Sequence, residues 1–335
     1  MSEQENKTYS GPLFIVGMPR SGTKLLRELC NQHPLISIPT AESHFIPYLY
    51  RRIGNKSMRG GRWRRAEKII CETNFYNIYR KKGLNPQWKK WYRKYKSEDL
   101  AFLIELLIRY YGPKDIDDRE VIWGDKTPAY LLHVKLLKKL FPEAKFLHII
   151  RDPRDYALSI NKTWGRDMII AAENWRRSVA ACREAGMQIG NDYLEIYYEN
   201  LISAPRETVQ KITDFLNIEF QESMLILEKS VENYGDAKES LQIESNNRRK
   251  FYHAMPRKKI QRIESLTYDL IKDMPYKLVF EHAEGSKLSG SQHFLHKFKD
   301  AFFTITFHIK DKGLWRGLRY FMKGRKISSW RQASD

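Results

Sequence analysis

The stretch LFIVGMPRSGTK, residues 13–24, is the most informative part of the sequence: an apolar strand runs into a glycine-containing loop, and a helix is predicted from about Thr23. Backbone N–H groups in such a loop converge on an anion at the helix N-terminus. The stretch nearly fits GxxxxGK[ST], but Thr23 stands where the lysine belongs and Lys24 where the magnesium-binding hydroxyl belongs. This reversal counts against a nucleotide triphosphatase, and Arg20 is the cation offered instead.

Apolar strands and helices alternate along the rest of the chain. Helices are predicted over 42–52, 100–111, 130–140 and 171–187, and strands over 121–123, 145–150 and 193–198. Strands that are apolar on both faces and separated by helices are typical of a mostly parallel sheet. We therefore predict an α/β, P-loop-like fold of three layers with a helical basic insertion and a helical C-terminal tail. One domain is expected over 10–284, with a separate tail over 285–335.

The charge is unevenly distributed over the 335 residues, whose net charge is +19. Residues 51–96 hold 16 Lys and Arg against 2 acidic residues, and residues 285–335 hold 11 against 3. The rest is close to neutral, so the two basic blocks predict contact with an anionic surface, either membrane lipid or a polyanion. The alternatives are a solvated basic face and, for the aromatic residues of 51–96, the core of a helical subdomain.

Several sequence features bear on location. The first ten residues are polar, no stretch is long and apolar enough to span a bilayer, and the three cysteines show no CxxC spacing. A reducing compartment such as the cytosol is therefore expected, with peripheral contact at the inner face of a membrane. In the tail, apolar residues recur every three to four positions, which predicts an interfacial amphipathic helix or one docked on the protein itself. They are Phe294, Phe298, Phe302, Ile305 and Ile309, followed by Leu314, Trp315, Leu318, Tyr320 and Phe321.

A second motif, RDPRDYALS at 151–159, follows the strand predicted before it. Asp152 suits the N-cap of a helix and Pro153 its first position. Arg151 is then held between a strand end and a positive helix terminus, where it can bind a phosphate, and Ser159 can add a hydroxyl two turns later. Alternatively, Arg151 pairs with an acidic side chain.

Together and in this order, the motifs resemble those of sulfotransferases that use 3′-phosphoadenosine 5′-phosphosulfate (PAPS). The likeness covers roughly Pro12 to Leu216 and is greatest to the bacterial and tyrosylprotein-type branches. Residues 17–23 are similar to the family's 5′-phosphosulfate loop, and residues 151–159 to its 3′-phosphate motif. The resemblance implies a set of donor-binding residues: Arg20, Ser21, Gly22, Thr23, Arg151, Ser159 and Tyr198. Lys24 departs from the family, which usually has a second Thr or Ser at this position, and we expect this added cation to strengthen phosphate binding.

The resemblance also implies the chemistry of the site. Arg20 would hold the 5′-phosphate, Lys126 would reach the transferring group, and Glu42 would deprotonate the acceptor. His44 stands where the family commonly has an arginine, so either Glu42 or His44 is the base. Trp123 or Trp164 would stack on adenine, and no metal is needed. Residues 246–257 are candidates for a loop that closes over the nucleotide.

The sequence thus predicts an enzyme that moves a sulfuryl group from PAPS to a hydroxyl by in-line displacement and releases adenosine 3′,5′-bisphosphate. A carbohydrate or lipid hydroxyl is favoured on the strength of the tail, and nucleic acid is not expected as a partner. An ATP-dependent, kinase-like P-loop transferase is one alternative. A non-catalytic module that binds polyanions or membranes is the other.

Overall fold

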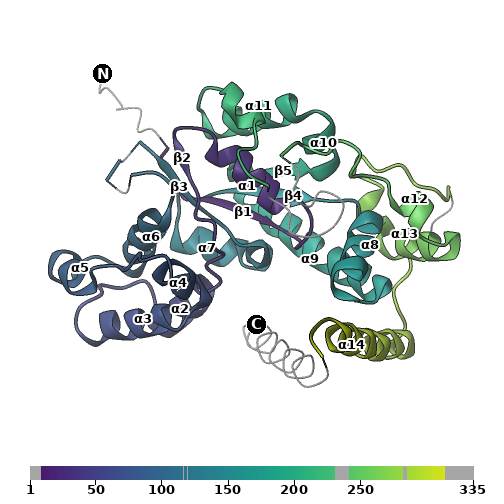
Figure 1. The fold of residues 1–335 in the computed structure, drawn as a ribbon, viewed down its shortest axis with the longest axis horizontal. Coiled ribbons are helices and arrows are strands. Elements are labelled where there is room, and N and C mark those ends of the chain that lie inside the picture. Colours follow the sequence, from purple (N-terminus) through teal and green to yellow (C-terminus); the bar gives the residue numbers. More distant parts are fainter. Residues whose placement is uncertain (1–8, 116, 119, 231–240, 282–284, 314–335) are drawn as a thin grey trace. The chain divides into compact units, whose positions relative to one another are not determined.

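The computed structural model describes residues 9–115, 117–118, 120–230, 241–281 and 285–313 (Figure 1). Within these ranges the chain forms two compact units. Unit 1 holds the residues up to Ile150 together with 181–230 and 241–243. Unit 2 holds 151–180 and the residues from 244 onward.

Unit 1 is built on a parallel sheet of five strands in the order β2–β3–β1–β4–β5. The strands are β1 (Leu13–Gly17), β2 (Ile36–Ser37), β3 (Ile122–Lys126), β4 (Lys145–Ile150) and β5 (Tyr193–Tyr197). Strands β1 and β3 run side by side with Ile15 opposite Lys126. Because they are parallel, the loop after β1 and the end of β3 leave the sheet at the same edge. The sheet confirms the predicted α/β fold.

Helices cover both faces of this sheet (Figure 1). Ile15 of β1 belongs to an aliphatic cluster with Leu26 and Ile212, while Phe14 points to the other face and packs on Phe146. This alternation is what a strand buried between two layers requires. The helices are α1 (Thr23–Asn31), α6 (Leu100–Tyr111), α7 (Val134–Leu140), α10 (Tyr198–Ser203) and α11 (Pro205–Leu216), with 3₁₀ turns at Pro128–Leu132, Gly190–Asp192 and Glu222–Leu225.

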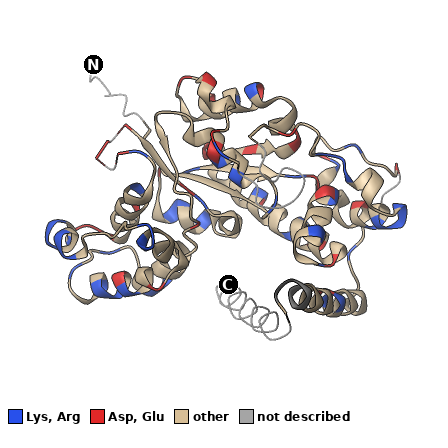
Figure 2. Ribbon diagram, viewed as in Figure 1, with Lys and Arg blue, Asp and Glu red and all other residues tan. Residues whose placement is uncertain are grey.

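The basic insertion is helical, as predicted. Its helices are α2 (Ile46–Ile53), α3 (Gly61–Cys71), α4 (Asn74–Arg80) and α5 (Trp88–Tyr95). Its aromatic rings pack on one another, Trp63 against Trp88 and Phe75 against Tyr79. The Lys and Arg residues of these helices are exposed, and Figure 2 shows that they are distributed over the helices of the insertion. Trp63, Phe75 and Tyr79 are buried and form a small core, as the alternative to a mixed aromatic and basic surface requires, whereas the aromatic residues of α5 are only half-buried.

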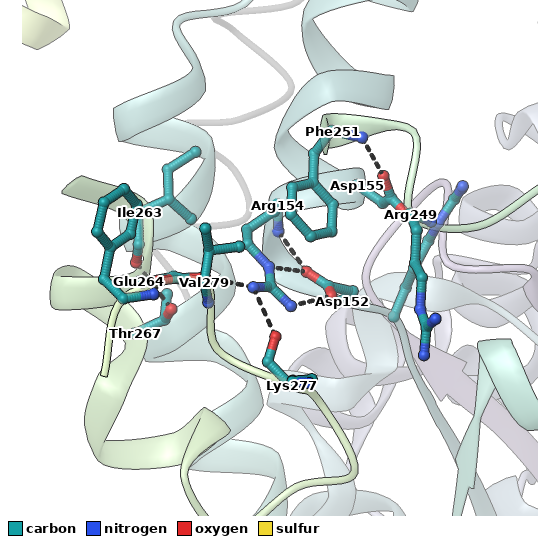
Figure 3. Close-up of polar contacts among 12 residues, drawn as sticks. Asp152, Arg154, Asp155, Arg249, Phe251, Ile263, Glu264, Thr267, Lys277 and Val279 are labelled. Atoms are coloured by element: carbon teal, nitrogen blue, oxygen red, sulfur yellow. Dashed lines mark hydrogen bonds and ion pairs between the residues drawn. The ribbon is translucent and has the colours of Figure 1, made fainter. Parts of the chain in front are cut away.

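Unit 2 contains α8 (Pro153–Trp164), the first part of α9 (Met168–Ile189), α12 (Phe251–Ala254), α13 (Arg257–Ile271) and α14 (Gly290–Lys312). Helix α8 is capped as predicted, since the Asp152 carboxylate accepts the backbone N–H of Arg154 at 2.9 Å. Buried Arg154 then joins α8 to α13 through ion pairs with Asp152 and Glu264 (Figure 3). This network anchors the start of α8.

The predicted tail helix begins at Gly290 as α14. Among the described residues, no helix has the length and apolar character needed to cross a membrane. The second part of the predicted tail pattern, from Leu314 to Phe321, lies outside the described residues, as does the side chain of Ile309.

Candidate active site

The loop between β1 and α1 is a tight turn held by its own backbone. Ser21 N–H donates to the Met18 carbonyl at 3.1 Å, and Arg20 adopts a left-handed conformation with φ of 69°. Gly22, the N-cap of α1, has φ of 91°, and a Cβ there would collide with the Tyr198 ring. Only glycine satisfies both constraints. The turn therefore presents the N-terminus of α1 directly, with Tyr198 packed beside it.

This loop has the features of a phosphate site. Because the N-cap is glycine, no side chain caps the first-turn N–H groups of α1. The Ser21 hydroxyl is fully buried and has no hydrogen-bond partner within the described part of the chain. Thr23 is buried, and Arg20 and Lys24 are half-buried cations in the same short segment. A buried donor without a partner at a positive helix terminus fits a phosphate or phosphosulfate oxygen.

Glu42 and Lys126, which lie far apart in the sequence, meet in the structure. Lys126 ends β3 with a side chain that is 1% exposed, and its ammonium forms an ion pair with Glu42 Oε1. The other carboxylate oxygen of Glu42 lies 2.9 Å from Nε2 of His44. Lys126 and the two candidate bases, Glu42 and His44, are therefore in one connected cluster. Its carboxylate and imidazole remain partly exposed.

Glu42 sits on a loop rather than on the predicted helix over 42–52, so that prediction is wrong at its start. Helix α2 begins at Ile46, whose N–H donates to the Tyr130 hydroxyl at 3.1 Å. His44 has a left-handed φ of 53°, which a continuous right-handed helix cannot accommodate. Such a conformation costs about 1–3 kcal/mol and persists where surrounding contacts impose it, often at functional sites.

Those contacts are side-chain hydrogen bonds that the sequence did not reveal. Arg27 on α1 donates to the Thr40 carbonyl at 2.7 Å. Ser43 N–H donates to the Thr127 hydroxyl at 3.0 Å, and the Ser43 and Tyr130 hydroxyls lie 2.6 Å apart. The segment that carries Glu42 is thus joined to α1 on one side and to the segment after β3 on the other.

Burial and the neighbouring charges shift the pKa values of Glu42 and Lys126. Burial raises the pKa of Glu42, but the hydrogen bond from His44 and the charge of Lys126 outweigh it and lower that pKa to about 2. Burial lowers the pKa of Lys126, and Glu42 opposes this effect. Glu42 is therefore a carboxylate throughout the ordinary pH range. A base this weak needs the charge of Lys126 to be drawn away before it can compete for a proton.

Asp125 is a further charged residue that the sequence analysis did not single out. It precedes Lys126 on β3 and points to the opposite face, fully buried. Burial raises its pKa to about 6, although Thr127 and Ser43 act in the other direction. It lies in the segment Trp-Gly-Asp-Lys-Thr-Pro, residues 123–128, and nothing in that segment indicates that it is buried. Asp125 is thus a buried acid that interacts with Ser43 and Thr127, two of the residues that hold the Glu42 segment in place.

In unit 2, Arg151 follows β4 in the chain and is 6% exposed. Its guanidinium donates to the Asn247 carbonyl at 3.2 Å, and its own carbonyl accepts the Trp175 indole N–H at 3.0 Å. Asp155 accepts the backbone N–H groups of Arg249 and Phe251 (Figure 3). Residues 247–251, part of the loop predicted to close over the nucleotide, therefore lie against the start of α8.

The remaining candidates are placed as follows. Ser159 is half-buried on α8, on the same face as Asp155. Trp123 is buried and packs edge-on against Phe14, so the prediction that it stacks on adenine is wrong. Its place in β3, between two layers, leaves no ring face for a ligand. Trp164 is exposed at the end of α8.

The predicted residues thus fall into two groups. Arg20 to Lys24, Glu42, Lys126 and Tyr198 belong to unit 1, and Arg151 and Ser159 belong to unit 2. Within unit 1, contacts connect Glu42 with Lys126 and Tyr198 with the loop at Gly22. The arrangement in unit 1 can bind an anion and hold a carboxylate base beside a buried cation.

Comparison with known proteins gives a consistent result. A protein-family model described as "Sulfotransferase family" matches residues 12–222. "Protein-tyrosine sulfotransferase A" from Caenorhabditis elegans is 26% identical over 64% of this chain and 51% of its own length, and "Protein-tyrosine sulfotransferase 1" from Danio rerio is 24% identical over 64% and 55%. The chain spans about half the length of these relatives. The "Sulfotransferase Domain from the Synechococcus PCC 7002 Olefin Synthase" has a similar fold, with a TM-score of 0.50 and 23% identity over 80% of this chain and 98% of that one.

Proposed function

The chain belongs to the sulfotransferase family, and from this premise we propose that it transfers a sulfuryl group from PAPS to an acceptor hydroxyl by in-line displacement. One observation carries the proposal: Glu42 and Lys126 converge at the edge of the sheet where the β1–α1 loop also lies. Sulfuryl transfer needs a base for the acceptor proton and a cation for charge on the leaving phosphate. This pair supplies one of each.

The residues present fit the donor. We propose that the β1–α1 loop takes the 5′-phosphosulfate, with the Ser21 hydroxyl, the first-turn N–H groups of α1, Arg20 and Lys24 as donors of hydrogen bonds and charge. Arg151 and Ser159 would take the 3′-phosphate, and Tyr198 would lie beside the nucleotide. Bound there, PAPS supplies the sulfuryl group and leaves as adenosine 3′,5′-bisphosphate.

Residues of the chain itself then remove the proton of the acceptor hydroxyl. Glu42 accepts it from the acceptor hydroxyl, and Lys126 neutralises charge as it grows on the leaving oxygen. As Lys126 turns its charge toward that oxygen, it stabilises the Glu42 carboxylate less, and the pKa of Glu42 rises toward the range of a useful base. His44 keeps the second carboxylate oxygen oriented at 2.9 Å. His44 as the base itself is the alternative.

The weakness of this base bears on the acceptor. A phenol, with a pKa of about 10, gives up its proton more readily than an aliphatic hydroxyl. The relatives named above are protein-tyrosine sulfotransferases. We therefore place a tyrosyl hydroxyl first. A carbohydrate or lipid hydroxyl is the second candidate, favoured by the exposed apolar residues of α14.

Calorimetric titration with adenosine 3′,5′-bisphosphate tests the donor site. Wild type should bind the bisphosphate well and Mg-ATP weakly, and Arg151→Ala should lose most of the bisphosphate affinity. Arg176→Ala is a matched control, since Arg176 lies in the same unit and pairs with Asp269 at the surface. A preference for Mg-ATP, or bisphosphate binding unchanged in Arg151→Ala, would contradict the proposal.

A sulfuryl-transfer assay with labelled PAPS separates the acceptors. Tyrosine-containing peptides, oligosaccharides and glycolipid dispersions should be compared at one pH. Faster transfer to a tyrosyl peptide supports the phenol. Transfer restricted to a glycan or lipid would assign the second candidate and imply a stronger base than Glu42 in its free state.

A further inference from the structure

Helix α14 carries a continuous apolar row on its outer side. Phe294, Phe298 and Phe302 are 74%, 66% and 57% exposed, and they recur every four residues, so they line up along one face. Leu295 beside them is half exposed. Among the described residues, nothing covers this row, which we call the α14 stripe. Exposed aromatic residues grouped in this way mark an interaction surface rather than scattered surface residues.

The orientation of the stripe is fixed by contacts on the other side of α14. Asp300 is buried, and its two carboxylate oxygens accept from Nε of Arg166 at 2.7 and 2.9 Å. It also accepts the Asp167 N–H at 2.9 Å. Phe307 packs against Gly165, which ends α8. Helical periodicity places Asp300 and Phe307 opposite Phe298. The protein therefore holds this helix by the side that carries Asp300 and Phe307 and presents the side that carries the stripe outward.

The charge around the stripe indicates which kind of partner binds it. Lys297 and Lys299 are exposed and, by helical geometry, lie on either side of it. Residues 285–335 as a whole hold 11 Lys and Arg against 3 acidic residues. A second copy of the chain would bring the same positive charge to the contact, which opposes association. An anionic lipid surface attracts it.

We propose that α14 lies on an anionic membrane surface. The phenylalanines of the stripe enter the boundary between headgroups and acyl chains, and Lys297 and Lys299 extend to lipid phosphates. The helix lies along the surface. This proposal is independent of the chemistry proposed for the loop and for Glu42.

Vesicle sedimentation tests it with the full chain. Wild type should bind vesicles of phosphatidylcholine and phosphatidylglycerol in equal parts, bind pure phosphatidylcholine far more weakly, and be released by salt. The double variant F298S/F302S should bind the anionic vesicles about tenfold more weakly or worse, because two buried phenyl groups are lost. Met187→Ser is a matched control, since Met187 is equally exposed but lies on α9.

The outcomes are distinct. Circular dichroism and bisphosphate affinity should be the same for wild type and F298S/F302S, because the stripe makes no contact on which the fold depends. Anionic-vesicle binding unchanged in that variant, or no binding by wild type, overturns the proposal. Self-association of wild type that disappears in the variant would assign the stripe to a second copy instead.

Discussion

Unit 1 and unit 2 each bury a cation near the end of a parallel strand, but they surround it differently. Lys126 at the end of β3 is 1% exposed and pairs with Glu42, whose side chain is 32% exposed. Arg154, just after β4, is 2% exposed and pairs with Asp152 and Glu264, both nearly inaccessible to solvent. It also donates to the Lys277 carbonyl at 3.0 Å (Figure 3).

The surroundings shift the pKa values of these two cations in opposite directions. Burial lowers the pKa of Lys126 more than Glu42 raises it, whereas burial of Arg154 is outweighed by Asp152 and Glu264, which raise its pKa. Carboxylate and carbonyl oxygens of the protein surround the planar guanidinium of Arg154 and accept its hydrogen bonds, which suits a fixed structural contact between α8 and α13. Lys126 is itself buried, but its partner Glu42 faces solvent, so a ligand that reaches Glu42 can meet the charge of Lys126. We call Lys126 the accessible cation and Arg154 the enclosed cation. We therefore expect the same burial to serve stability in unit 2 and the proposed chemistry in unit 1.

Removing the enclosed cation should have the largest effect. Arg154→Met leaves the Asp152 and Glu264 carboxylates buried without their partner, so the free energy of unfolding should fall by about 3–5 kcal/mol. Urea denaturation measures this. Arg176→Met is the control, because its pair with Asp269 is partly exposed and should contribute at most about 1 kcal/mol. Equal losses in the two variants would remove the distinction between enclosed and accessible cations.

Replacing Lys126, the accessible cation, should lower the reaction rate and leave stability intact. Lys126→Met should lower kcat by about 10²–10³, the usual loss when one group that stabilises transition-state charge is removed. Its free energy of unfolding should stay the same or rise, because a buried charge is replaced by an apolar chain of similar length. Rate assays and urea denaturation on the same preparation check both. A large loss of stability with little loss of rate would make Lys126 a second structural contact.

The sequence predicted the accessible cation better than the enclosed one. Strand β1 and its loop are local patterns, and a loop at a strand end points to a ligand whatever lies elsewhere. Lys126 was identified through the resemblance to the family. The contact at Arg154 depends on Glu264, more than a hundred positions later in the chain. No local pattern indicates such a partner. Glu42 was identified through resemblance, but its loop conformation depends on Tyr130 and Thr127, which only the folded structure brings to it.

Asp125 is enclosed like Arg154, but because it is an acid its raised pKa favours the uncharged form. The folded protein keeps its proton up to about pH 6, whereas an unfolded chain loses it near 3.8. The folded state thus binds more protons within this window, and the contribution of Asp125 to stability falls as pH rises through it. Asp125→Asn should therefore be more stable than wild type by about 1–3 kcal/mol at neutral pH and nearly equal at pH below 4. Thermal unfolding at both pH values measures the difference.

The smallest effect should come from replacing His44, which bonds to Glu42, the partner of Lys126. His44→Asn keeps the left-handed backbone, which asparagine tolerates well, and removes the hydrogen bond to Glu42. The pKa of Glu42 should then rise from about 2 toward its ordinary value, so the acid limb of kcat/KM should move to higher pH. At neutral pH the rate should fall about two- to tenfold, the effect of one hydrogen bond.

The pH profile also identifies the base, with Glu42→Gln as the companion variant. If Glu42 is the base, Glu42→Gln loses most activity at every pH, and His44→Asn keeps a shifted acid limb. If His44 is the base, His44→Asn abolishes that limb, and Glu42→Gln retains it at reduced rate. The second result would move the base from the carboxylate paired with Lys126 to the imidazole at its outer side. Lys126 would then stabilise charge on the leaving group with Glu42 as its fixed counterion, a role closer to that of the carboxylates around Arg154.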